Sequence, residues 1–493
     1  MREDQTLLST LGLTAAKGRN PRITGLASDS REVREGYLFA ALPGVKAHGA
    51  AYVDAVLEAG ASAVLTDAEG AALARDALES SDAALVVTTA PRETLARTAA
   101  LWFGAQPETL VAVTGTNGKT SVTSFVRQIW TLLGHSAVNL GTTGVEGAWA
   151  APLVHTTPDP ITLHRALADA ASNGVTHAAM EASSHGLDQR RLDGVTLRAA
   201  GFTNFTQDHL DYHETFEGYF DAKAGLFARV LPEDAKAVIN IEADRGTDMA
   251  AIATARNCPV VSVGRRIGDF HLGNILVDAT GQTVAFRHLD KTYVKRLGLI
   301  GEFQAENVMM AAALVIACGE DPGHVFDTFE DLETVRGRMQ LAATRENGAA
   351  VFVDYAHTPD AVETALRALR PHVLGRLVAI VGAGGDRDAT KRPLMGQAAA
   401  DHADLVIVTD DNPRSEDPAS IRASVLLGAP DALEVGDRAE AILRGVDALG
   451  PGDALLIAGK GHETGQIVGD DVLPFDDAEQ ASVAVSALDG RFA

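Results

Sequence analysis

The segment 109–121 constrains the fold of this 493-residue chain more than any other. Its apolar, β-branched run, Leu110 to Val113, predicts a buried parallel strand, and the stretch from Ser121 to Leu133 predicts a helix. A glycine-containing turn, Gly-Thr-Asn-Gly-Lys-Thr, joins the two. A strand, a glycine turn and a helix N-terminus bring backbone N–H groups together at the positive end of the helix dipole. The segment therefore predicts an anion site.

The turn has the residues of a phosphate-binding loop with a shortened spacing. Lys119 would reach the β- and γ-phosphates of a nucleotide, and the hydroxyl of Thr120 would bind Mg²⁺. The general pattern places a glycine five residues before Gly118, where this chain has Val113, and Gly115 lies only three residues before it. An ordinary turn is disfavoured, because the loop, the Lys-Thr pair and the flanking elements agree. The residues predicted to bind ATP here are Gly115, Thr116, Asn117, Gly118, Lys119, Thr120 and Ser121.

Length and composition restrict the class of protein. At about 150 residues per domain, the length predicts roughly three domains. The sequence shows no export signal, no apolar run long enough to span a membrane and only two cysteines. We therefore expect a cytoplasmic monomer that acts on small molecules and does not insert into a membrane. A net charge of −24 disfavours nucleic-acid binding and requires cations to be concentrated locally around a bound nucleotide.

Changes of pattern divide the chain into domains at 1–88, 89–336 and 337–493. The first is a compact α/β stretch. In the second, strands alternate with helices, as in the strand His177–Glu181 and the helix Gln304–Cys318. The fold class is therefore α/β, with a parallel sheet around the phosphate loop of the central domain.

The last domain predicts a doubly wound, Rossmann-like parallel sheet. Four strand-like runs alternate with helical segments, and each leads directly into a polar loop that contains glycine or proline. Because ligands bind outside the carboxyl ends of the strands in such sheets, the loops predict a second ligand site. The strand runs are Ala350–Asp354, Leu377–Val381, Leu405–Thr409 and Ala454–Ala458, and the loops are 354–360, 382–388, 410–414 and 459–463.

Three features of the central domain are open to two interpretations. Glu181, at the end of a strand, is well placed to bind Mg²⁺, although it could be an acidic surface residue. The segment 203–213 is rich in His and Asp and could bind a metal or form a polar turn. Lys223 is a lone lysine among apolar helical residues, and this pattern alone favours a surface lysine with its stem along the apolar surface.

The chain resembles the Mur ligases over essentially its whole length, and most closely the members that add diaminopimelate. The resemblance implies a UDP-binding N-terminal domain, a central ATPase domain and a C-terminal Rossmann-like domain that binds the amino acid. His155 and Gln304 stand where we expect the family to carry asparagine. The motifs that carry the resemblance, in the family's order, are 28–31, 114–120, 181–186, 208–213, 337–339, 354–360 and 411–414.

The resemblance also implies site residues. Ser28, Ser30, Val45, Lys46 and Ala47 would bind the uridine diphosphate, and Thr156, Thr157, Ser183, Gln189 and Arg191 the muramoyl dipeptide. Thr120, Glu181 and His209 would bind Mg²⁺, and Asn307, Arg338 and His357 would contact the nucleotide. Lys223 would be carboxylated by CO₂ and act with Lys119, Glu181 and His209 in catalysis. The amino acid would be bound by Arg387, Asp411, Asn412, Pro413, Arg414, Gly459 and Glu463.

The implied activity is amide-bond formation driven by ATP and Mg²⁺ in peptidoglycan precursor synthesis. The γ-carboxylate of UDP-N-acetylmuramoyl-L-alanyl-D-glutamate would form an acyl phosphate, which the amine of meso-2,6-diaminopimelate would attack. Arg414 points to this amino acid, because its planar guanidinium pairs with a distal carboxylate that lysine lacks. Glu463 would bind the distal ammonium.

Three alternatives stay open. The same reaction could use L-lysine or L-ornithine, and the chain could be a ligase like folylpolyglutamate synthase. It could also be a nucleotide-dependent switch that ligates nothing. The motif 28–31 and the N-terminal domain disfavour the synthase, and the four loops of the last domain disfavour the switch.

Overall fold

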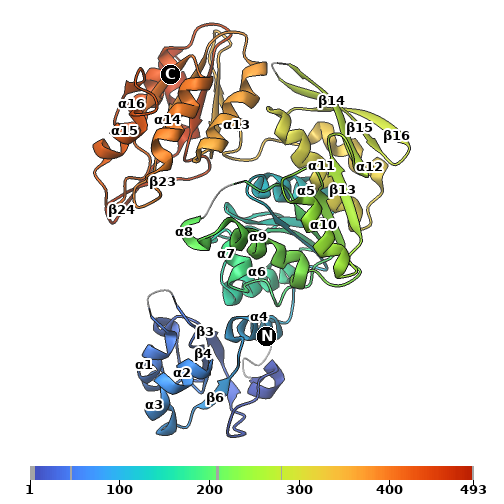
Figure 1. Ribbon diagram of the computed structural model, residues 1–493, viewed down its shortest axis with the longest axis vertical. Helices are drawn as coiled ribbons and strands as arrows, with labels where there is room; N and C mark the ends of the chain where they lie inside the picture. Colours follow the sequence, from blue (N-terminus) through green and yellow to red (C-terminus); the bar gives the residue numbers. More distant parts are fainter. Residues whose placement is uncertain (1–5, 45–46, 207–209, 279, 491–493) are drawn as a thin grey trace. The chain divides into compact units, whose positions relative to one another are not determined.

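The computed structural model describes residues 6–44, 47–206, 210–278 and 280–490 (Figure 1). The chain falls into two compact units, the first made of residues 1–262 and 313–320 and the second of 263–312 and 321–493. Strand β13 (Val260–Gly264) and helix α11 (Glu302–Ala317) each run from one unit into the other. Among the described residues, every helix is too short or too polar to cross a bilayer.

The first unit begins with a small parallel sheet in the order β3-β4-β5-β6, preceded by the antiparallel pair β1–β2. Proline at the start of the last helix, α4, fits the first turn, where no partner for its missing N–H is needed. The strands are β1 (Thr6–Leu7), β2 (Arg22–Ile23), β3 (Gly25–Ala27), β4 (Tyr37–Ala40), β5 (Ala63–Thr66) and β6 (Ala84–Val87), and the helices are α1 (Val53–Glu58), α2 (Ala68–Leu73), α3 (Arg75–Glu79) and α4 (Pro91–Phe103).

The same unit contains the phosphate-loop sheet, in the order β12-β11-β7-β10-β8-β9. All pairs are parallel except β8–β9. Strand β7 is buried along almost its whole length, as its uninterrupted apolar run predicts. The strands are β7 (Thr109–Thr114), β8 (Ala137–Gly141), β9 (Gly144–Gly147), β10 (His177–Glu181), β11 (Ala199–Phe202) and β12 (Lys236–Asn240), and the helices are α5 (Lys119–Leu132), α6 (Pro160–Ser172), α7 (Ser184–Asp188), α8 (Leu210–His213), α9 (Phe216–Gly225) and α10 (Gly246–Ala255).

The second unit contains an antiparallel meander and a six-stranded sheet in the order β17-β18-β22-β19-β20-β21. The sequence did not predict the antiparallel strands at the edges of these sheets, such as β17 beside β18. The strands are β14 (Phe270–Asp278), β15 (Gly281–His288), β16 (Lys291–Leu297), β17 (Gln340–Thr344), β18 (Ala350–Asp354), β19 (Leu377–Val381), β20 (Leu405–Val408), β21 (Leu433–Glu434), β22 (Ala454–Ala458), β23 (Gly465–Val468) and β24 (Asp471–Pro474), and the helices are α12 (Pro322–Asp327), α13 (Pro359–Leu369), α14 (Lys391–His402), α15 (Pro418–Leu426), α16 (Arg438–Asp447) and α17 (Asp477–Leu488).

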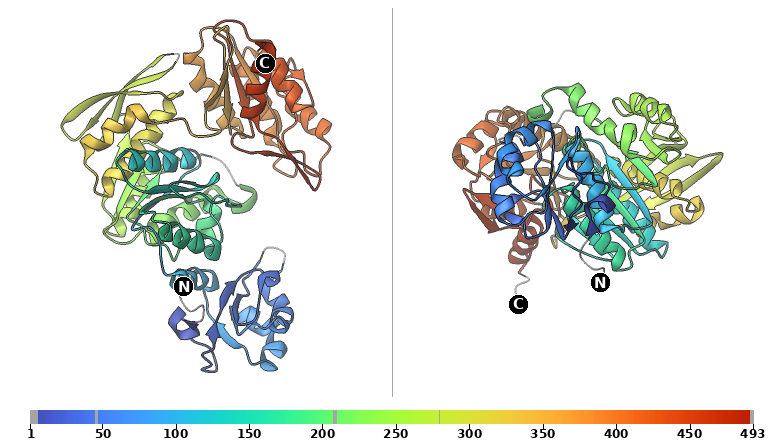
Figure 2. Two further views of the ribbon diagram at one scale, coloured as in Figure 1. Left: turned by 180° about the vertical axis from the view of Figure 1, so that it is seen from behind. Right: turned by 90° about the horizontal axis from the view of Figure 1, so that it is seen from below.

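The six-stranded sheet has helices on both faces (Figure 2). It has a hydrophobic core on each face, as a doubly wound fold requires. Leu377 and Ala379 of β19 pack in one core with residues of α13, α14 and α15. Val378 and Ile380 point to the other face and pack with residues of α16 and α17. Because successive side chains of a strand alternate between faces, a strand buried on both faces reads as one continuous apolar run.

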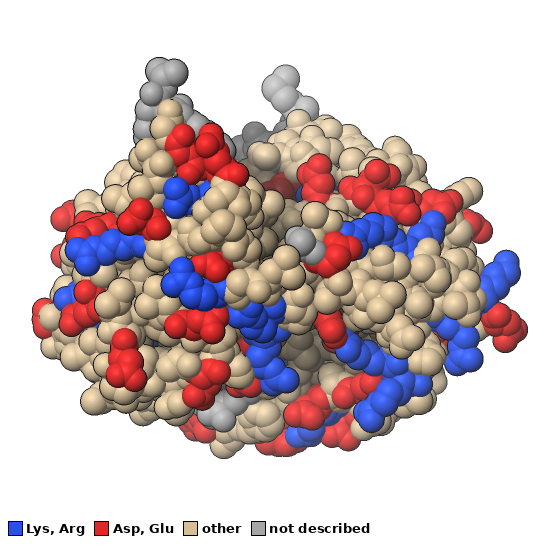
Figure 3. Space-filling model, turned by 90° about the horizontal axis from the view of Figure 1, so that it is seen from above, with Lys and Arg blue, Asp and Glu red and all other residues tan. Residues whose placement is uncertain are grey.

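Acidic and basic side chains are interspersed on the face that Figure 3 shows. The chain has 66 acidic and 42 basic residues, and on this face the acidic ones do not gather into one region. Such a mixture is typical of a solvated protein surface.

A buried ion pair lies at the carboxyl ends of β20 and β22, the two strands that flank β19 in the six-stranded sheet. Arg438 and Asp477 have fully buried side chains and pair through two hydrogen bonds of 2.7 Å. The same guanidinium donates to the carbonyl oxygens of Asp410 and Ala458, at 3.3 and 3.1 Å. Arg438 thus ties together the starts of two of the loops that the sequence assigns to ligand binding.

We expect Asp477→Ala to destabilise the protein by about 3–5 kcal/mol, because it leaves the Arg438 guanidinium buried without its counter-ion. Urea unfolding followed by circular dichroism measures the change. Glu440→Ala is the matched control, since it removes a carboxylate from the exposed Arg444–Glu440 pair. Equal shifts for the two variants would show that burial of the Arg438 pair does not matter.

Candidate active site

The phosphate loop lies between β7 and α5 and is held by backbone contacts. Gly118, with φ 86°, precedes α5, which begins at Lys119 and has no side-chain cap, so its leading N–H groups face the loop. Thr116 N–H donates to the Asn204 carbonyl at 2.9 Å, and Asn117 N–H to the Asn204 side chain at 2.8 Å. Lys119 Nζ donates to the carbonyls of Gly115 and Thr116, both at 2.8 Å. The loop thus holds a cation next to a helix N-terminus, which suits a phosphate.

Glu181 is buried, so its interpretation as an acidic surface residue is wrong. Its Oε1 accepts hydrogen bonds from Thr120 Oγ1 at 3.0 Å and from Thr142 N–H at 2.8 Å. A side chain at Gly141 would collide with this carboxylate, so glycine leaves it room. The Glu181 and Thr120 oxygens are hard donors of the kind Mg²⁺ prefers, and these residues therefore fit a Mg²⁺ site next to the phosphate loop.

Lys223 is also buried, with 1% of its surface exposed, so the surface lysine that the pattern alone favoured is wrong. Helix α9 is buried from Tyr219 to Phe220 and from Ala222 to Gly225, and the lysine has no solvent face to reach. Its Nζ donates to the Gly115 carbonyl at 2.7 Å and lies 4.4 Å from the centre of the Tyr219 ring. The fold therefore brings Lys223 to the same carbonyl oxygen that Lys119 contacts.

The residues expected at the muramoyl dipeptide lie beside Glu181. Thr157 Oγ1 donates to the Glu181 carbonyl at 2.9 Å and accepts from Ser183 N–H at 3.0 Å. Arg191 donates to the Thr157 carbonyl at 2.5 Å and to Gln189 Oε1 at 2.8 Å, and burial lowers the pKa of its guanidinium. Thr156 Oγ1 lies 3.0 Å from Thr142 Oγ1, so this set connects to the Glu181 carboxylate.

Two groups of predicted residues are only partly described. Val45, Lys46 and His209 lie outside the described residues. Ser28 and Ser30 follow β3, where the intervening Asp29 pairs with Arg31, and the guanidinium lowers the pKa of the Asp29 carboxyl to about 2. Ala47 is exposed in the loop that follows β4.

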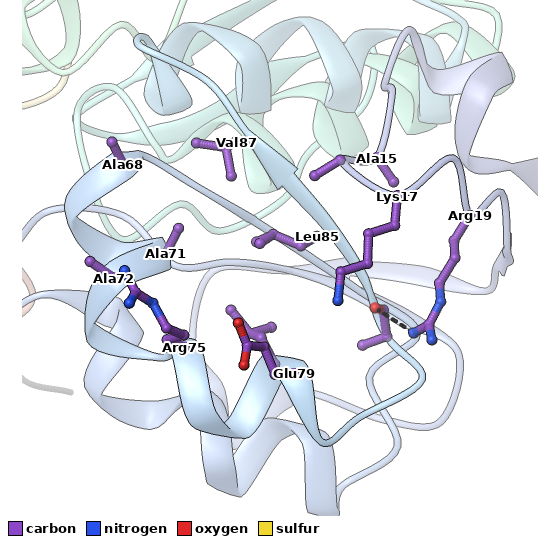
Figure 4. A pocket seen from close by; sticks show the side chains of 13 residues that line it. Ala15, Lys17, Arg19, Ala68, Ala71, Ala72, Arg75, Glu79, Leu85 and Val87 are labelled. Carbon is purple, nitrogen blue, oxygen red and sulfur yellow. Dashed lines mark hydrogen bonds between the residues drawn. The ribbon is translucent and has the colours of Figure 1, made fainter.

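A separate cavity of about 360 Å³ opens in the N-terminal sheet (Figure 4). Helices α2 and α3 form one side, Lys17 and Arg19 the other, and Leu85 and Val87 of β6 lie between them. None of the described residues predicted to bind the uridine diphosphate lines it. The cavity thus lies in the domain that the resemblance assigns to that ligand, but its lining does not include Ser28, Ser30 or Ala47.

In the second unit, the four polar loops follow four adjacent parallel strands, β18, β22, β19 and β20, as the sequence predicts. Asn412 is a junction between them, because its side chain accepts from Lys460 Nζ at 3.0 Å and donates to Glu463 Oε2 at 2.9 Å. Arg414, with φ 52°, donates from Nη1 to the Gly385 carbonyl at 2.8 Å. Arg387 is exposed in the loop after β19, and Asp411 and Gly459 are neighbours in these loops.

The expected nucleotide contacts of this unit form a second group. Asn307 donates to Gln304 Oε1 at 3.1 Å, and Gln304 donates to the Arg338 carbonyl at 3.5 Å. The Arg338 guanidinium lies 4.6 Å from the centre of the Tyr355 ring, which lies 4.5 Å from the His357 ring. Gln304 is thus part of this group although it departs from the expected asparagine.

The comparisons with known proteins agree along the chain. Three family profiles match it: Mur ligase family, catalytic domain, at 22–102, Mur ligase middle domain at 113–315, and Mur ligase, glutamate ligase domain, at 337–461. The chain is 50% identical over 471 residues to the UDP-N-acetylmuramoyl-L-alanyl-D-glutamate–2,6-diaminopimelate ligase of Bradyrhizobium diazoefficiens, covering 94% of this chain and 95% of that protein. The chain belongs to the Mur ligase family.

Further relatives agree with this assignment. The protein of the same name from Caulobacter vibrioides is 47% identical over 477 residues, covering 95% of this chain and 97% of that protein. A solved structure of a UDP-N-acetylmuramoyl-L-alanyl-D-glutamate–2,6-diaminopimelate ligase superposes with a TM-score of 0.67 at 33% identity, covering 94% of this chain and 95% of that one. The three-domain fold is therefore that of the Mur ligases.

Sequence reasoning did not single out two residues that this Mur ligase places in its candidate site. Lys460 is fully buried and bridges Asn412 and Glu463, the latter at 3.0 Å. A lysine between two glycines of a loop already assigned to ligands was the available signal. Thr142 donates to both oxygens of Glu181, and nothing in the sequence near it indicates this contact.

Proposed function

We propose that this Mur ligase joins meso-2,6-diaminopimelate to UDP-N-acetylmuramoyl-L-alanyl-D-glutamate and converts ATP to ADP and phosphate. The choice of amino acid rests on the surroundings of Arg414 in the loop after β20. Its guanidinium donates to the Asn412 carbonyl, and the Asn412 side chain donates to Glu463. The names of the full-length relatives support the same assignment.

The phosphate loop is suited to bind the nucleotide. Lys119 would exchange its two carbonyl partners for phosphate oxygens, and the N–H groups at the start of α5 would point to the same anion. Thr120 and Glu181 would hold Mg²⁺, with His209 as the third residue that the family resemblance implies. When bound, the ion offsets negative charge as two anions approach each other.

The proposed reaction proceeds in two steps. A carboxylate oxygen of the D-glutamyl residue bonds to the γ-phosphorus, and the bond to ADP breaks. The amine of diaminopimelate then bonds to the acyl carbon, phosphate leaves with the carboxylate oxygen, and the amine releases a proton. Lys119 offsets the charge that builds up on the transferring phosphoryl group. Arg191, which donates to Thr157 and Gln189, would orient the peptide beside Glu181.

Arg414 has capacity left for a ligand. Of its three guanidinium nitrogen atoms, only Nη1 has a hydrogen-bond partner among the described residues, so the guanidinium retains N–H groups for a bidentate pair with a carboxylate. Asn412 and Lys460 both hold Oε2 of Glu463, which fixes the direction of this carboxylate for an ammonium group. L-Lysine or L-ornithine would leave Arg414 unpaired, which disfavours them as substrates.

We expect Arg414→Ala to raise the KM for diaminopimelate about 10- to 100-fold, because a hydrogen-bonded charge pair contributes about 1.5–3 kcal/mol. The KM for ATP should change little. ADP release measured at varied concentrations of each substrate gives both values, and L-lysine as a competing donor gives the selectivity. Arg367→Ala, which removes an exposed arginine of α13, is the control. Unchanged selectivity over lysine in Arg414→Ala would contradict this role.

Carboxylation of Lys223 also belongs to the proposal. The Lys119 and Lys223 ammonium groups both donate to the Gly115 carbonyl, and two like charges on one oxygen repel each other. The Lys223 ammonium would first lose a proton, and addition of CO₂ to the neutral Nζ would form a carbamate and release a second proton. The anionic carbamate would replace this repulsion by attraction. The anionic oxygens would then favour a cation beside the loop.

We expect turnover to fall in buffer depleted of CO₂ and to recover when bicarbonate is added, because a carbamate forms reversibly. ADP release measured before and after the addition tests this. In Lys223→Gln, turnover should be low and should not respond to bicarbonate. Wild-type activity that is equal with and without CO₂ would contradict the modification.

A further inference from the structure

A cluster of metal-binding side chains lies at the end of the central sheet opposite the phosphate loop. His135 precedes β8, His177 is the first residue of β10, and Glu320 follows α11. One possible ligand atom of each lies within 4.8 Å of the other two, and among the described residues this is the group with such spacing. His135 Nε2 lies 2.9 Å from Glu320 Oε1, and each of these side chains is about 30% exposed.

Hydrogen bonds orient the His177 ring for such a role. The Thr176 hydroxyl donates its one proton to the Ser136 carbonyl at 3.2 Å and lies 2.8 Å from His177 Nδ1. In the Nδ1–H tautomer, the hydroxyl oxygen accepts from Nδ1–H and the lone pair lies on Nε2. A hydrogen bond from the other ring nitrogen is what fixes a metal-binding histidine in most proteins. The rings of Trp130 and His135, centred 4.9 and 4.1 Å away, hold the imidazole on two sides.

We infer that His135, His177 and Glu320 form a binding site for a divalent transition metal ion of the Zn²⁺ type. Two imidazoles and one carboxylate are ligands that such ions accept, whereas Mg²⁺ prefers oxygen ligands alone. Three protein ligands leave a fourth position to water, and the partial exposure of the cluster allows the ion to enter. The alternative to a metal site is a neutral His177 that stacks on the His135–Glu320 pair.

The site is separate from the proposed reaction. Strand β10 carries His177 at its first residue and Glu181 at its last, so the two lie about 13 Å apart along the strand. A bound ion would connect the starts of β8 and β10 to the segment after α11. The expected effect of the metal is therefore on the stability of the central sheet.

Zn²⁺ titration of the metal-free, full-length protein tests the inference. Calorimetry in millimolar Mg²⁺ should show one saturable Zn²⁺ site per chain, which raises the melting temperature. His135→Gln and Glu320→Gln should each weaken binding about 10-fold or more. His402→Gln, which removes a histidine paired with Glu363 alone at 3.6 Å, should leave it unchanged.

Co²⁺ provides a second reading, because Trp130 lies against His177 and a paramagnetic ion there quenches its fluorescence. Zn²⁺ should reverse the quenching, and Trp130→Phe should lose the quenching while keeping the calorimetric site. Circular dichroism confirms that each variant is folded. Equal Zn²⁺ affinity in wild type, His135→Gln and Glu320→Gln, or displacement by millimolar Mg²⁺, would overturn the inference.

Discussion

Two lysines that donate to one carbonyl oxygen are the constraint on which the phosphate loop depends. Lys119 and Lys223 both contact the Gly115 carbonyl, at 2.8 and 2.7 Å. Lys119 begins α5 and Lys223 lies in α9, so the loop conformation joins two elements far apart in the sequence. Concentrating positive charge here allows a chain with a net charge of −24 to bind a polyanion. Carboxylation of Lys223 would replace the repulsion between the two ammonium groups by attraction and would add an anionic group that can bind a cation.

The second unit uses the same principle of fixing polar groups before a ligand arrives. The Asn412 side chain forms hydrogen bonds with Lys460, Glu463 and the Ile467 N–H. Arg438 donates to the carbonyl of Ala458, at the end of β22, and to the carbonyl of Asp410, in the loop after β20. Groups that are already oriented lose little entropy when a ligand binds. In the proposed function, this is how one arginine, Arg414, would decide between amino acids that differ by a carboxylate.

The sequence predicted those features that depend on local pattern. The strands β18, β19 and β22 have the predicted bounds, because strands buried on both faces are continuous apolar runs. Their polar loops could be predicted as a site since parallel strands end at one edge of a sheet. The environments of Glu181 and Lys223 could not be predicted, because only the folding of the chain brings Thr142 to Glu181 and Gly115 to Lys223. The cluster of His135, His177 and Glu320 was missed for the same reason.

In the proposed reaction, the phosphate loop serves transfer of the γ-phosphoryl group to a carboxylate rather than to water. The most direct measurement labels the γ-carboxylate of the D-glutamyl residue with ¹⁸O and analyses the phosphate released by mass spectrometry. Through an acyl phosphate, the released phosphate carries one ¹⁸O atom from the substrate, and its release depends on diaminopimelate. Unlabelled phosphate, or release that does not require the amino acid, would contradict it.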